Sequence, residues 1–409
     1  MSNFQAALTR LYGLTARGRV LGLERLAAAC ERFGHPERSF RAIHVAGTNG
    51  KGTVSAFLAS MLRVSGKTVG LYTSPHLCRF AERVRINGEP LSDDRIAELV
   101  NRVMDAAPEL TFFETTTLVA FLAFQEAGVE TAVLEVGLGG RLDATNVIPP
   151  PDVAVITRVA YDHIAELGDS LFKIATEKAG IIKPGCKVVV GRLHPDAREA
   201  IEQRVREVGA ELLPLGGPEP IPGAPLAYPR LSMVGTNLAV AVTTARALGL
   251  DPRHIADGIE QMEWPGRNEL LHRNGQELTL LDCAHNPDGA VALAHSLDPS
   301  MLGDIESRRD IALVFGAIHT KNYRAMLQRL EPVAFHRVYV APPINKAVPP
   351  TDLQAVLPGE IAPDVPTALA RARELVGAKG VVVVTGSTFL VGAARAALLG
   401  LPIDPPVDL

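Results

Sequence analysis

The segment Ala42–Ser55, AIHVAGTNGKGTVS, has the residue types of a phosphate-binding loop. Its apolar residues Ala42–Ala46 predict a buried strand, and the three glycines that follow permit a tight turn and close approach of a ligand. Backbone N–H groups at the start of the next helix favour an anion. Lys51 supplies a cation for the outer phosphates, and Thr53 supplies a hydroxyl for Mg²⁺. The pattern therefore predicts nucleotide phosphate binding, with a plain glycine turn as the alternative.

Three polar residues, Ser74, Glu135 and His163, lie at or beyond the ends of other predicted strands. Open α/β sheets bind ligands outside the carboxyl ends of their strands. Glu135 is the most informative, because a carboxylate inside a buried strand is costly unless it is paired or bound to a cation. Beside a phosphate loop Mg²⁺ is the natural partner, and an ion pair with Arg141 is the alternative. Ser74 alone is also typical of a turn, and His163 alone of a satisfied core residue.

Four further residues carry weaker signals. Lys178, which follows Glu177 and precedes another predicted strand, is typical of a solvated or ion-paired side chain. Later strands lead to Asp282 and His285 and to Ser387, which indicates a second ligand-binding edge. Ordinary helix capping is the alternative for residues near these strand ends, and the two roles are compatible.

A scaffold of alternating strands and helices must bring these residues together. Alternation of this kind predicts an α/β fold whose mostly parallel sheet is covered on both faces. The first series of predicted strands is Ala42–Ala46, Thr68–Thr73, Thr131–Val136, Val153–Thr157 and Lys187–Gly191; the second is Leu278–Asp282, Ile311–Phe315, Arg337–Ala341 and Val381–Thr385. Predicted helices include Val54–Ser65, Ser92–Ala106, Thr116–Ala127 and Gly235–Leu248. Pro and Gly in Trp264–Asn268 place the boundary between domains 1–266 and 267–409.

Composition excludes several classes of protein. Hydrophobic residues make up 47% of the 409 residues and charged residues 21%, which is typical of a globular chain with sizeable cores. The formal net charge of −4 creates no field that attracts nucleic acid or an anionic membrane. The four cysteines form no CxxC pair, which favours reduced thiols in a cytoplasmic protein over disulfides or zinc. We find neither a signal-peptide pattern nor an apolar run of membrane-spanning length.

Taken together, the motifs resemble those of the folylpolyglutamate synthase and dihydrofolate synthase family, within the Mur ligase superfamily. The resemblance extends from about Leu21 to Gly392. It is carried, in this order, by HVAGTNGKGTV, YTSPHL followed by ERVRING, EVGLGGRLDATN, DHIAELGDS, EKAGIIKPG, PGRNE, DCAHNP and TGSTFLVG. The implied fold is a P-loop-containing sheet domain that binds ATP, followed by a smaller Rossmann-like α/β domain that accepts glutamate.

The resemblance implies roles in binding ATP and metal. Ser74, Glu135 and His163 would ligate Mg²⁺. Lys178 matches a carbamylated lysine, whose CO₂-derived carbamate helps to hold a second Mg²⁺. Lys51, Glu135, His163 and Lys178 would thus be the catalytic residues. Positions that match ATP contacts are Asn49, Gly50, Lys51, Gly52, Thr53, Asn237, Arg267 and Asp282.

The implied reaction is ATP-dependent joining of L-glutamate to a pterin-linked carboxylate through an acyl phosphate. The acceptor would be dihydropteroate or a reduced folate. The resemblance favours a bifunctional enzyme, in part because the segment Leu142–Ala144 is present; an enzyme that only elongates folates is the alternative. We expect a monomer. His285 and Ser387 match the region that receives glutamate. Segments matching the pterin side are Leu21, Gly22 and Leu23, then Thr111, Phe112, Phe113 and Glu114, then Leu142, Asp143 and Ala144.

Three other functions agree less well with the sequence. A cell-wall Mur ligase carries a nucleotide-sugar domain before its phosphate loop, and only 46 residues precede Gly47 here. A GTPase-like switch calls for an NKxD signature, whereas Asn345 and Lys346 are followed by Ala347 and Val348. A nicotinamide enzyme calls for GxGxxG, which GTNGKG is not.

Overall fold

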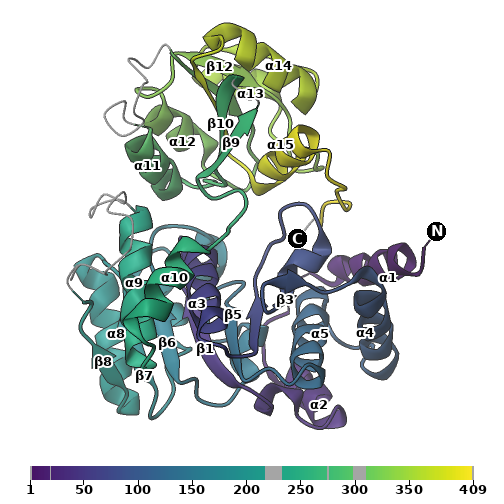
Figure 1. The fold of residues 1–409 in the computed structure, drawn as a ribbon, viewed down its shortest axis with the longest axis vertical. Coiled ribbons are helices and arrows are strands. Elements are labelled where there is room, and N and C mark those ends of the chain that lie inside the picture. Colours follow the sequence, from purple (N-terminus) through teal and green to yellow (C-terminus); the bar gives the residue numbers. More distant parts are fainter. Residues whose placement is uncertain (1, 19, 217–232, 274–275, 298–309, 408–409) are drawn as a thin grey trace. The chain divides into compact units, whose positions relative to one another are not determined.

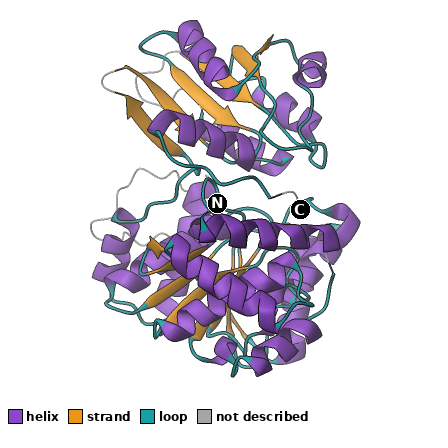
Figure 2. Cartoon of the chain, turned by 90° about the vertical axis from the view of Figure 1, so that its right-hand side faces the viewer, coloured by secondary structure: helices purple, strands orange, loops and turns teal. Residues whose placement is uncertain are grey.

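The computed structural model describes residues 2–18, 20–216, 233–273, 276–297 and 310–407. These residues divide into two compact units, each an α/β sheet flanked by helices (Figures 1 and 2). The first unit comprises Met1–His76 and Ala81–Glu263. The second comprises Trp264–Asp408 and also Leu77–Phe80.

The excursion Leu77–Phe80 was not part of the predicted domain division. It joins the second unit because its polar groups bond there. The Phe80 N–H donates to the Asp404 carboxylate at 2.8 Å, and the Arg79 guanidinium pairs with the same carboxylate at 3.1 Å. The Cys78 thiol donates to the carbonyl oxygen of Gly392 at 3.4 Å. A four-residue segment is thus held by partners more than 300 positions away, which no local sequence pattern indicates.

The first unit contains an eight-stranded sheet with the order β4-β3-β2-β5-β1-β6-β7-β8. Its strands are β1 Arg41–Ala46, β2 Val69–Tyr72, β3 Val84–Ile86, β4 Glu89–Pro90, β5 Thr131–Glu135, β6 Val153–Ile156, β7 Lys187–Val190 and β8 Glu211–Leu213. The pairs β2–β3 and β3–β4 are antiparallel, and all other pairs are parallel. The predicted mostly parallel sheet is therefore confirmed, with strand ends within two residues of those expected.

Helices cover both faces of this sheet. On one face, Ala154 and Ile156 of β6 pack with Ile174 and Ile201 from α7 and α8. On the other, α3 contacts β1, β2 and β5, and α9 contacts β6 and β7. The helices are α1 Asn3–Tyr12, α2 Glu24–Arg32, α3 Lys51–Val64, α4 Asp93–Ala106, α5 Phe112–Glu126, α6 Ile164–Leu167, α7 Leu171–Ala179, α8 Pro195–Val208, α9 Met233–Ala247 and α10 Pro252–Glu260, with short 3₁₀ turns that include Gly13–Arg17 and Ala144–Val147.

Two helices of the first unit begin earlier than predicted. Helix α5 begins at Phe112 rather than Thr116, because Thr111 and Glu114 form a capping box. Helix α3 begins at Lys51 rather than Val54, directly after Gly50. Both shifts move charged or polar residues of the candidate site from loops onto the first turns of helices.

The second unit contains a six-stranded sheet with the order β13-β12-β11-β14-β10-β9, in which only the β9–β10 pair is antiparallel. The strands are β9 Glu269–Arg273, β10 Gln276–Leu281, β11 Ile311–Phe315, β12 His336–Tyr339, β13 Glu360–Ile361 and β14 Val381–Thr385, and the helices are α11 Pro287–Ser296, α12 Tyr323–Leu330, α13 Pro350–Val356, α14 Val365–Val376 and α15 Thr388–Leu399. The apolar run VVVV forms strand β14, which is buried on both faces. Val381 and Val383 pack with α11 and α12, whereas Val382 and Val384 pack with α14 and α15.

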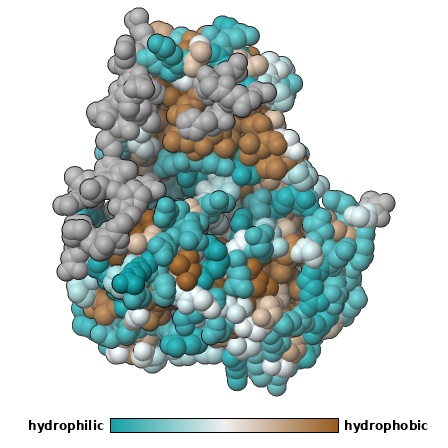
Figure 3. Space-filling model, viewed as in Figure 1, coloured by the Kyte–Doolittle hydropathy of each residue, from teal (hydrophilic) through white to brown (hydrophobic). Residues whose placement is uncertain are grey.

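The face shown in Figure 3 is mostly hydrophilic over the first unit, with scattered apolar patches. Within the part of the chain that the structure describes, each helix is too short or too polar to cross a membrane.

Candidate active site

The phosphate loop, Gly47–Thr53, connects β1 to α3 in a shape that requires glycine at two positions. Gly47 has a φ of +153° and Gly50 a φ of +87°, which L side chains rarely adopt. A Cβ atom at Gly47 would lie 1.9 Å from the Thr157 hydroxyl, and one at Gly50 would lie 2.3 Å from the Asn237 amide oxygen. The loop therefore packs closely on the residue that follows β6 and on helix α9.

Hydrogen bonds fix this loop to the chain after β6. The Thr157 hydroxyl donates to the carbonyl oxygen of Asn49 at 2.8 Å, and the Thr48 N–H donates to that of Arg158 at 2.6 Å. The ammonium group of Lys51, the first residue of α3, donates to the Thr48 carbonyl oxygen at 3.3 Å. The next two residues, Gly52 and Thr53, are half-buried in the first helical turn. That turn has no acidic residue, and the N–H groups at a helix start suit an anion.

Lys178, on α7, is buried against the phosphate loop. Its side chain is 3% exposed, and its ammonium group donates to the Gly47 carbonyl oxygen at 3.0 Å. Burial and the nearby charge of Lys51 lower its pKa to about 7, although Asp162 and Asp143 oppose the shift. A solvated side chain, which residue types alone indicated, is therefore wrong. The burial comes from packing between segments about 130 residues apart, which residue type does not reveal.

Glu135, the last residue of β5, is brought to Ser74. The Ser74 N–H donates to the Glu135 carboxylate at 3.1 Å, and Glu135 is 5% exposed. The alternative ion pair with Arg141 is not formed, because the Arg141 guanidinium pairs with Glu177 at 2.8 Å. A buried carboxylate thus lies at the edge of the sheet where the phosphate loop begins, since β1 and β5 are parallel neighbours.

His163 precedes the short helix α6, in a left-handed conformation with a φ of +50°. Its ring lies 3.9 Å from the Asp162 carboxylate and 4.0 Å from that of Glu166. No group of three or more His, Cys, Asp or Glu side chains among the described residues could by itself hold a metal ion. The described contacts join Glu135 to the Ser74 backbone and place His163 beside Asp162 and Glu166. Mg²⁺ needs no complete protein cage, because it keeps several waters and uses one or two carboxylates plus substrate phosphates. Its binding by Ser74, Glu135 and His163 stays a prediction.

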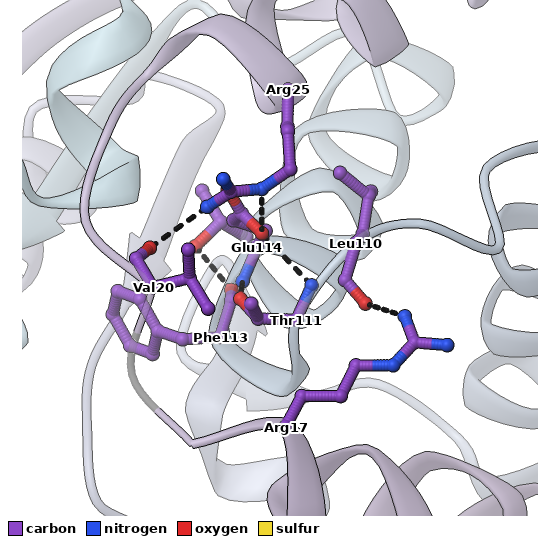
Figure 4. Close-up of polar contacts among 8 residues, drawn as sticks. Arg17, Val20, Arg25, Leu110, Thr111, Phe113 and Glu114 are labelled. Carbon is purple, nitrogen blue, oxygen red and sulfur yellow. Dashed lines mark hydrogen bonds and ion pairs between the residues drawn. The ribbon is translucent and has the colours of Figure 1, made fainter.

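The pterin-side residues form two groups in the first unit. In the first group, Leu21 is 59% exposed, and Leu23 is the N-cap of α2. Thr111 caps α5, and Glu114 is buried and paired with the Arg25 guanidinium at 3.0 Å (Figure 4). Phe112 and Phe113 occupy the first turn of α5, and the Phe113 ring packs on Gly137.

In the second group, Leu142 precedes Asp143, and Asp143 caps the turn that begins at Ala144. The Asp143 carboxylate accepts the Leu138 N–H at 2.9 Å and the Thr145 hydroxyl at 2.6 Å. Burial raises the Asp143 pKa, although these hydrogen bonds oppose the shift.

His44 is a buried neighbour of this group that our sequence reasoning missed. Its Nε2 lies 2.8 Å from the Thr145 hydroxyl oxygen. Since that hydroxyl donates to Asp143, it accepts from His44, which assigns the Nε2–H tautomer. Burial and the charge of Lys183 lower the His44 pKa to about 3, so the ring is neutral. In the sequence, a histidine that interrupts the apolar run of a predicted strand could have indicated this buried polar contact.

In the second unit, Asp282 organises the turn after β10. Its carboxylate accepts the N–H groups of Asn268 at 3.0 Å and Ala284 at 2.9 Å. Burial raises its pKa, and the neighbouring charge of Arg267 opposes the shift. The Arg267 guanidinium and the His285 ring both contact the Cys283 carbonyl oxygen, at 3.1 and 2.9 Å. The structure therefore brings Arg267, Asp282 and His285 together at one strand end.

Helix capping is present at the other strand end. The Ser387 hydroxyl oxygen accepts the Phe389 N–H at 3.2 Å, and Ser387 is 2% exposed. Asn286 likewise caps α11 by accepting the Gly289 N–H at 2.8 Å. Glutamate binding by Ser387 stays a prediction.

Comparisons with known proteins agree with this geometry. Residues 45–207 match the Mur ligase middle domain, and residues 266–388 match the glutamate ligase domain of Mur ligases. The chain is 33% identical to the Bacillus subtilis dihydrofolate synthase/folylpolyglutamate synthase, over 96% of this chain and 98% of that protein. It is 35% identical to the Lacticaseibacillus casei folylpolyglutamate synthase, over 92% and 94%.

Solved structures are similar over almost the whole chain. The E. coli FolC structure in complex with DHPP and ADP has a TM-score of 0.84 and 30% identity, covering 97% of this chain and 98% of that one. The bifunctional Yersinia pestis enzyme complexed with AMPPNP and Mn ion also has a TM-score of 0.84, with 32% identity, covering 98% and 99%.

Proposed function

Since this chain belongs to the dihydrofolate synthase/folylpolyglutamate synthase family of Mur ligases, we propose that it uses ATP to join L-glutamate to both dihydropteroate and reduced folates. The enzyme is a ligase that forms amide bonds. The observation that most supports this function is the phosphate loop with its two lysines. Lys51 bonds to the Thr48 carbonyl oxygen, and the buried Lys178 of α7 bonds to the Gly47 carbonyl oxygen.

The reaction has two steps. An acceptor carboxylate oxygen attacks the γ-phosphorus of ATP, the bond to the β,γ-bridging oxygen breaks, and ADP leaves. The amine of L-glutamate then attacks the carbonyl carbon of the acyl phosphate; inorganic phosphate leaves, and the amine loses a proton. The N–H groups at the start of α3 and the Lys51 ammonium group would neutralise charge on the transferring phosphoryl oxygens, so the protein would act mainly by positioning and electrostatics.

Mg²⁺ fits the donors beside this loop. We propose that Glu135, Ser74 and His163 hold it together with ATP phosphate oxygens and water. When bound, the ion would neutralise phosphate charge. The buried Glu135 carboxylate supports this assignment, because it lies at the end of β5 beside the start of the phosphate loop, and a buried carboxylate is costly unless it is paired or bound to a cation.

We further propose that CO₂ carbamylates Lys178. A buried ammonium group beside the Lys51 cation is unfavourable, and a carbamate would convert that repulsion into attraction. Burial lowers the Lys178 pKa to about 7, so near neutral pH a large fraction of the side chain is the neutral amine that can attack CO₂. The carbamate would provide oxygen ligands for a second Mg²⁺.

Other residues have proposed roles in binding. Asn237, which packs on Gly50, would contact ATP, as would Arg267 and Asp282 of the second unit. His285 and Ser387 would receive glutamate. We also propose that the enzyme acts as a monomer in the cytoplasm, where its four buried cysteines stay reduced.

Phosphate release tests the function directly. Purified protein should release phosphate from ATP only when a pterin acceptor and L-glutamate are both present. Dihydropteroate and tetrahydrofolate should each support the reaction, with mass spectrometry identifying the glutamylated product. Activity with tetrahydrofolate alone would restrict the enzyme to folate elongation. Activity with neither acceptor would overturn the proposal.

A further inference from the structure

Arg25, on α2, makes an ion pair that joins two segments of the pterin side. Its Nη2 donates to the Glu114 carboxylate at 3.0 Å and to the Val20 carbonyl oxygen at 2.8 Å. Its Nε lies 3.4 Å from the other Glu114 oxygen. Figure 4 shows the guanidinium group reaching both the Val20 backbone and the first turn of α5. One side chain therefore connects the segment before α2 to the N-terminus of α5.

Both oxygens of the Glu114 carboxylate accept hydrogen bonds from other residues of the protein. It is 3% exposed, and its Oε2 also accepts the Thr111 N–H at 2.8 Å. Both carboxylate oxygens thus bond either to Arg25 or to the cap of α5. Such a carboxylate is better placed to orient Arg25 than to contact a substrate.

The acceptor-side segment, Val20–Leu23, exposes apolar side chains to solvent. Val20 and Leu21 are 48% and 59% exposed although both are apolar. Gly22 adopts a φ of +127°, and Leu23 caps α2 without a side-chain hydrogen bond. The Val20 carbonyl oxygen is bonded to Arg25, and the Leu23 carbonyl oxygen accepts the Ala27 N–H at 2.8 Å, so backbone groups hold the segment at both ends.

A second arginine, Arg17, contacts the chain just before α5. The Arg17 guanidinium donates to the carbonyl oxygen of Leu110 at 2.7 Å (Figure 4). It also donates to the carbonyl oxygen of Pro108 at 2.6 Å. Arginines on both sides of the acceptor-side segment thus bond to the chain leading into α5.

We propose that Arg25 is a positioning residue for the pterin-bearing acceptor, and that Glu114 acts through it. The pair joins the acceptor-side segment to the first turn of α5, where its exposed apolar side chains and Phe113 would cover the flat face of a pterin ring. This inference rests on the proposed function, because it assumes a pterin acceptor. It makes the ion pair a determinant of acceptor affinity without contact to the reacting atoms.

Arg25→Gln tests the proposal in the full-length enzyme. We expect the KM for dihydropteroate to rise about 10-fold or more, because small displacements of positioning groups are costly, while the KM for ATP stays within about twofold. Arg25→Lys, which keeps the charge, should restore part of the affinity. Arg32→Gln is the matched control. Arg32 lies on the same helix, but it bonds to Glu109 and the Ala106 carbonyl oxygen, away from the acceptor-side segment.

Glu114→Gln separates the indirect role from direct contact. The amide oxygen can still accept the Thr111 N–H, so helix α5 keeps its cap. We expect the same rise in acceptor KM as in Arg25→Gln, and no further rise in the double variant. A defect in Glu114→Gln with a normal Arg25→Gln would show direct contact and overturn the proposal. An equal rise in the KM for ATP would also overturn it. Absence of any pterin-dependent ligation in the unmodified enzyme would instead refute the proposed function.

Discussion

The phosphate loop and the acceptor-side segment lie in the same unit but are held in different ways. The loop is fixed by a threonine side chain and backbone groups from the chain after β6, and close packing leaves no space for a Cβ atom at Gly47 or Gly50. The acceptor-side segment is joined to α5 by the long, partly exposed side chain of Arg25, which bonds to the Val20 carbonyl oxygen and to Glu114. Rigid backbone contacts therefore surround the predicted phosphoryl transfer, and adjustable side-chain contacts surround the predicted acceptor.

This difference suggests a division of labour. Phosphoryl transfer depends on groups placed to within a fraction of an ångström, which a packed loop provides. Acceptors with different pterin oxidation states and tails need a site whose side chains can move, and a contact made by the long Arg25 side chain permits such movement. Substitutions in the phosphate loop should then lower the rate with every acceptor, and substitutions at Arg25 or Glu114 should alter the preference among acceptors.

The largest expected effect is that of Lys51→Ala. A unit charge about 4 Å from the transferring oxygens, at an effective dielectric near 20, is worth about 4 kcal/mol, or roughly a thousandfold in rate. Phosphate release at saturating ATP should fall by that factor with both acceptors. Lys173→Ala, which removes a surface lysine paired with Asp169, should be unaffected. Near-normal turnover in Lys51→Ala would contradict the central role of the loop.

Lys178 should give the next largest effect. Removal of CO₂ and bicarbonate should lower activity about 100-fold, the order of magnitude lost with one group that stabilises a developing charge. Bicarbonate should restore the unmodified enzyme but not Lys178→Ala. Isotope-labelled bicarbonate followed by NMR would detect the carbamate without relying on activity. Full activity in CO₂-free buffer would rule the carbamate out.

The phosphate loop could be predicted from sequence because its chemistry depends on adjacent residues. Glycines, a lysine and a hydroxyl between a strand and a helix already define the turn and its anion site. The parallel strands could also be predicted, because strands buried on both faces form unbroken apolar runs such as Val381–Thr385. The short antiparallel strands β3, β4 and β9 carry no such signal and were not predicted.

The contacts of the acceptor side could not be predicted from local pattern. Arg25 and Glu114 are 89 residues apart, and His44 and Thr145 are 101 residues apart. Each residue alone is compatible with a solvated or satisfied side chain. Lys178 shows the same limit, since only its packing against Gly47 reveals that it is buried. Contacts between neighbouring residues, such as those of the phosphate loop, can therefore be predicted from the sequence. Contacts between residues far apart in the chain are known only from the folded structure.

His44 lies in β1, the strand that leads into the phosphate loop, and bonds to Thr145, whose hydroxyl donates to Asp143. It therefore connects that strand to the second pterin-side group. Its pKa in the folded state is about 3, well below the ordinary 6.5. As the pH falls below 6.5, the unfolded chain binds a proton that the folded chain cannot. Folding stability should therefore be lost progressively from pH 6.5 downward, by about 2 kcal/mol at pH 5.

His44→Gln isolates this contribution. The glutamine amide can still donate to the Thr145 hydroxyl but does not titrate. Its melting temperature should fall less than that of the unmodified enzyme between pH 7 and pH 5, when both are followed by differential scanning fluorimetry. Equal losses for the two proteins would mean that other groups cause the acid sensitivity.

The smallest expected effect comes from the ion pair of Arg32 with Glu109, whose side chains are 43% and 41% exposed. Exposed pairs contribute about 0–1 kcal/mol, because water screens the charges and ordering two long side chains costs entropy. Arg32→Gln should therefore change the melting temperature little and leave both acceptor KM values unchanged. Arg25 bonds to the same region of the chain from the same helix, but its partner Glu114 is buried. If Arg32→Gln weakened acceptor binding as strongly as Arg25→Gln, general attachment of α2, rather than the position of Val20–Leu23, would control the acceptor site.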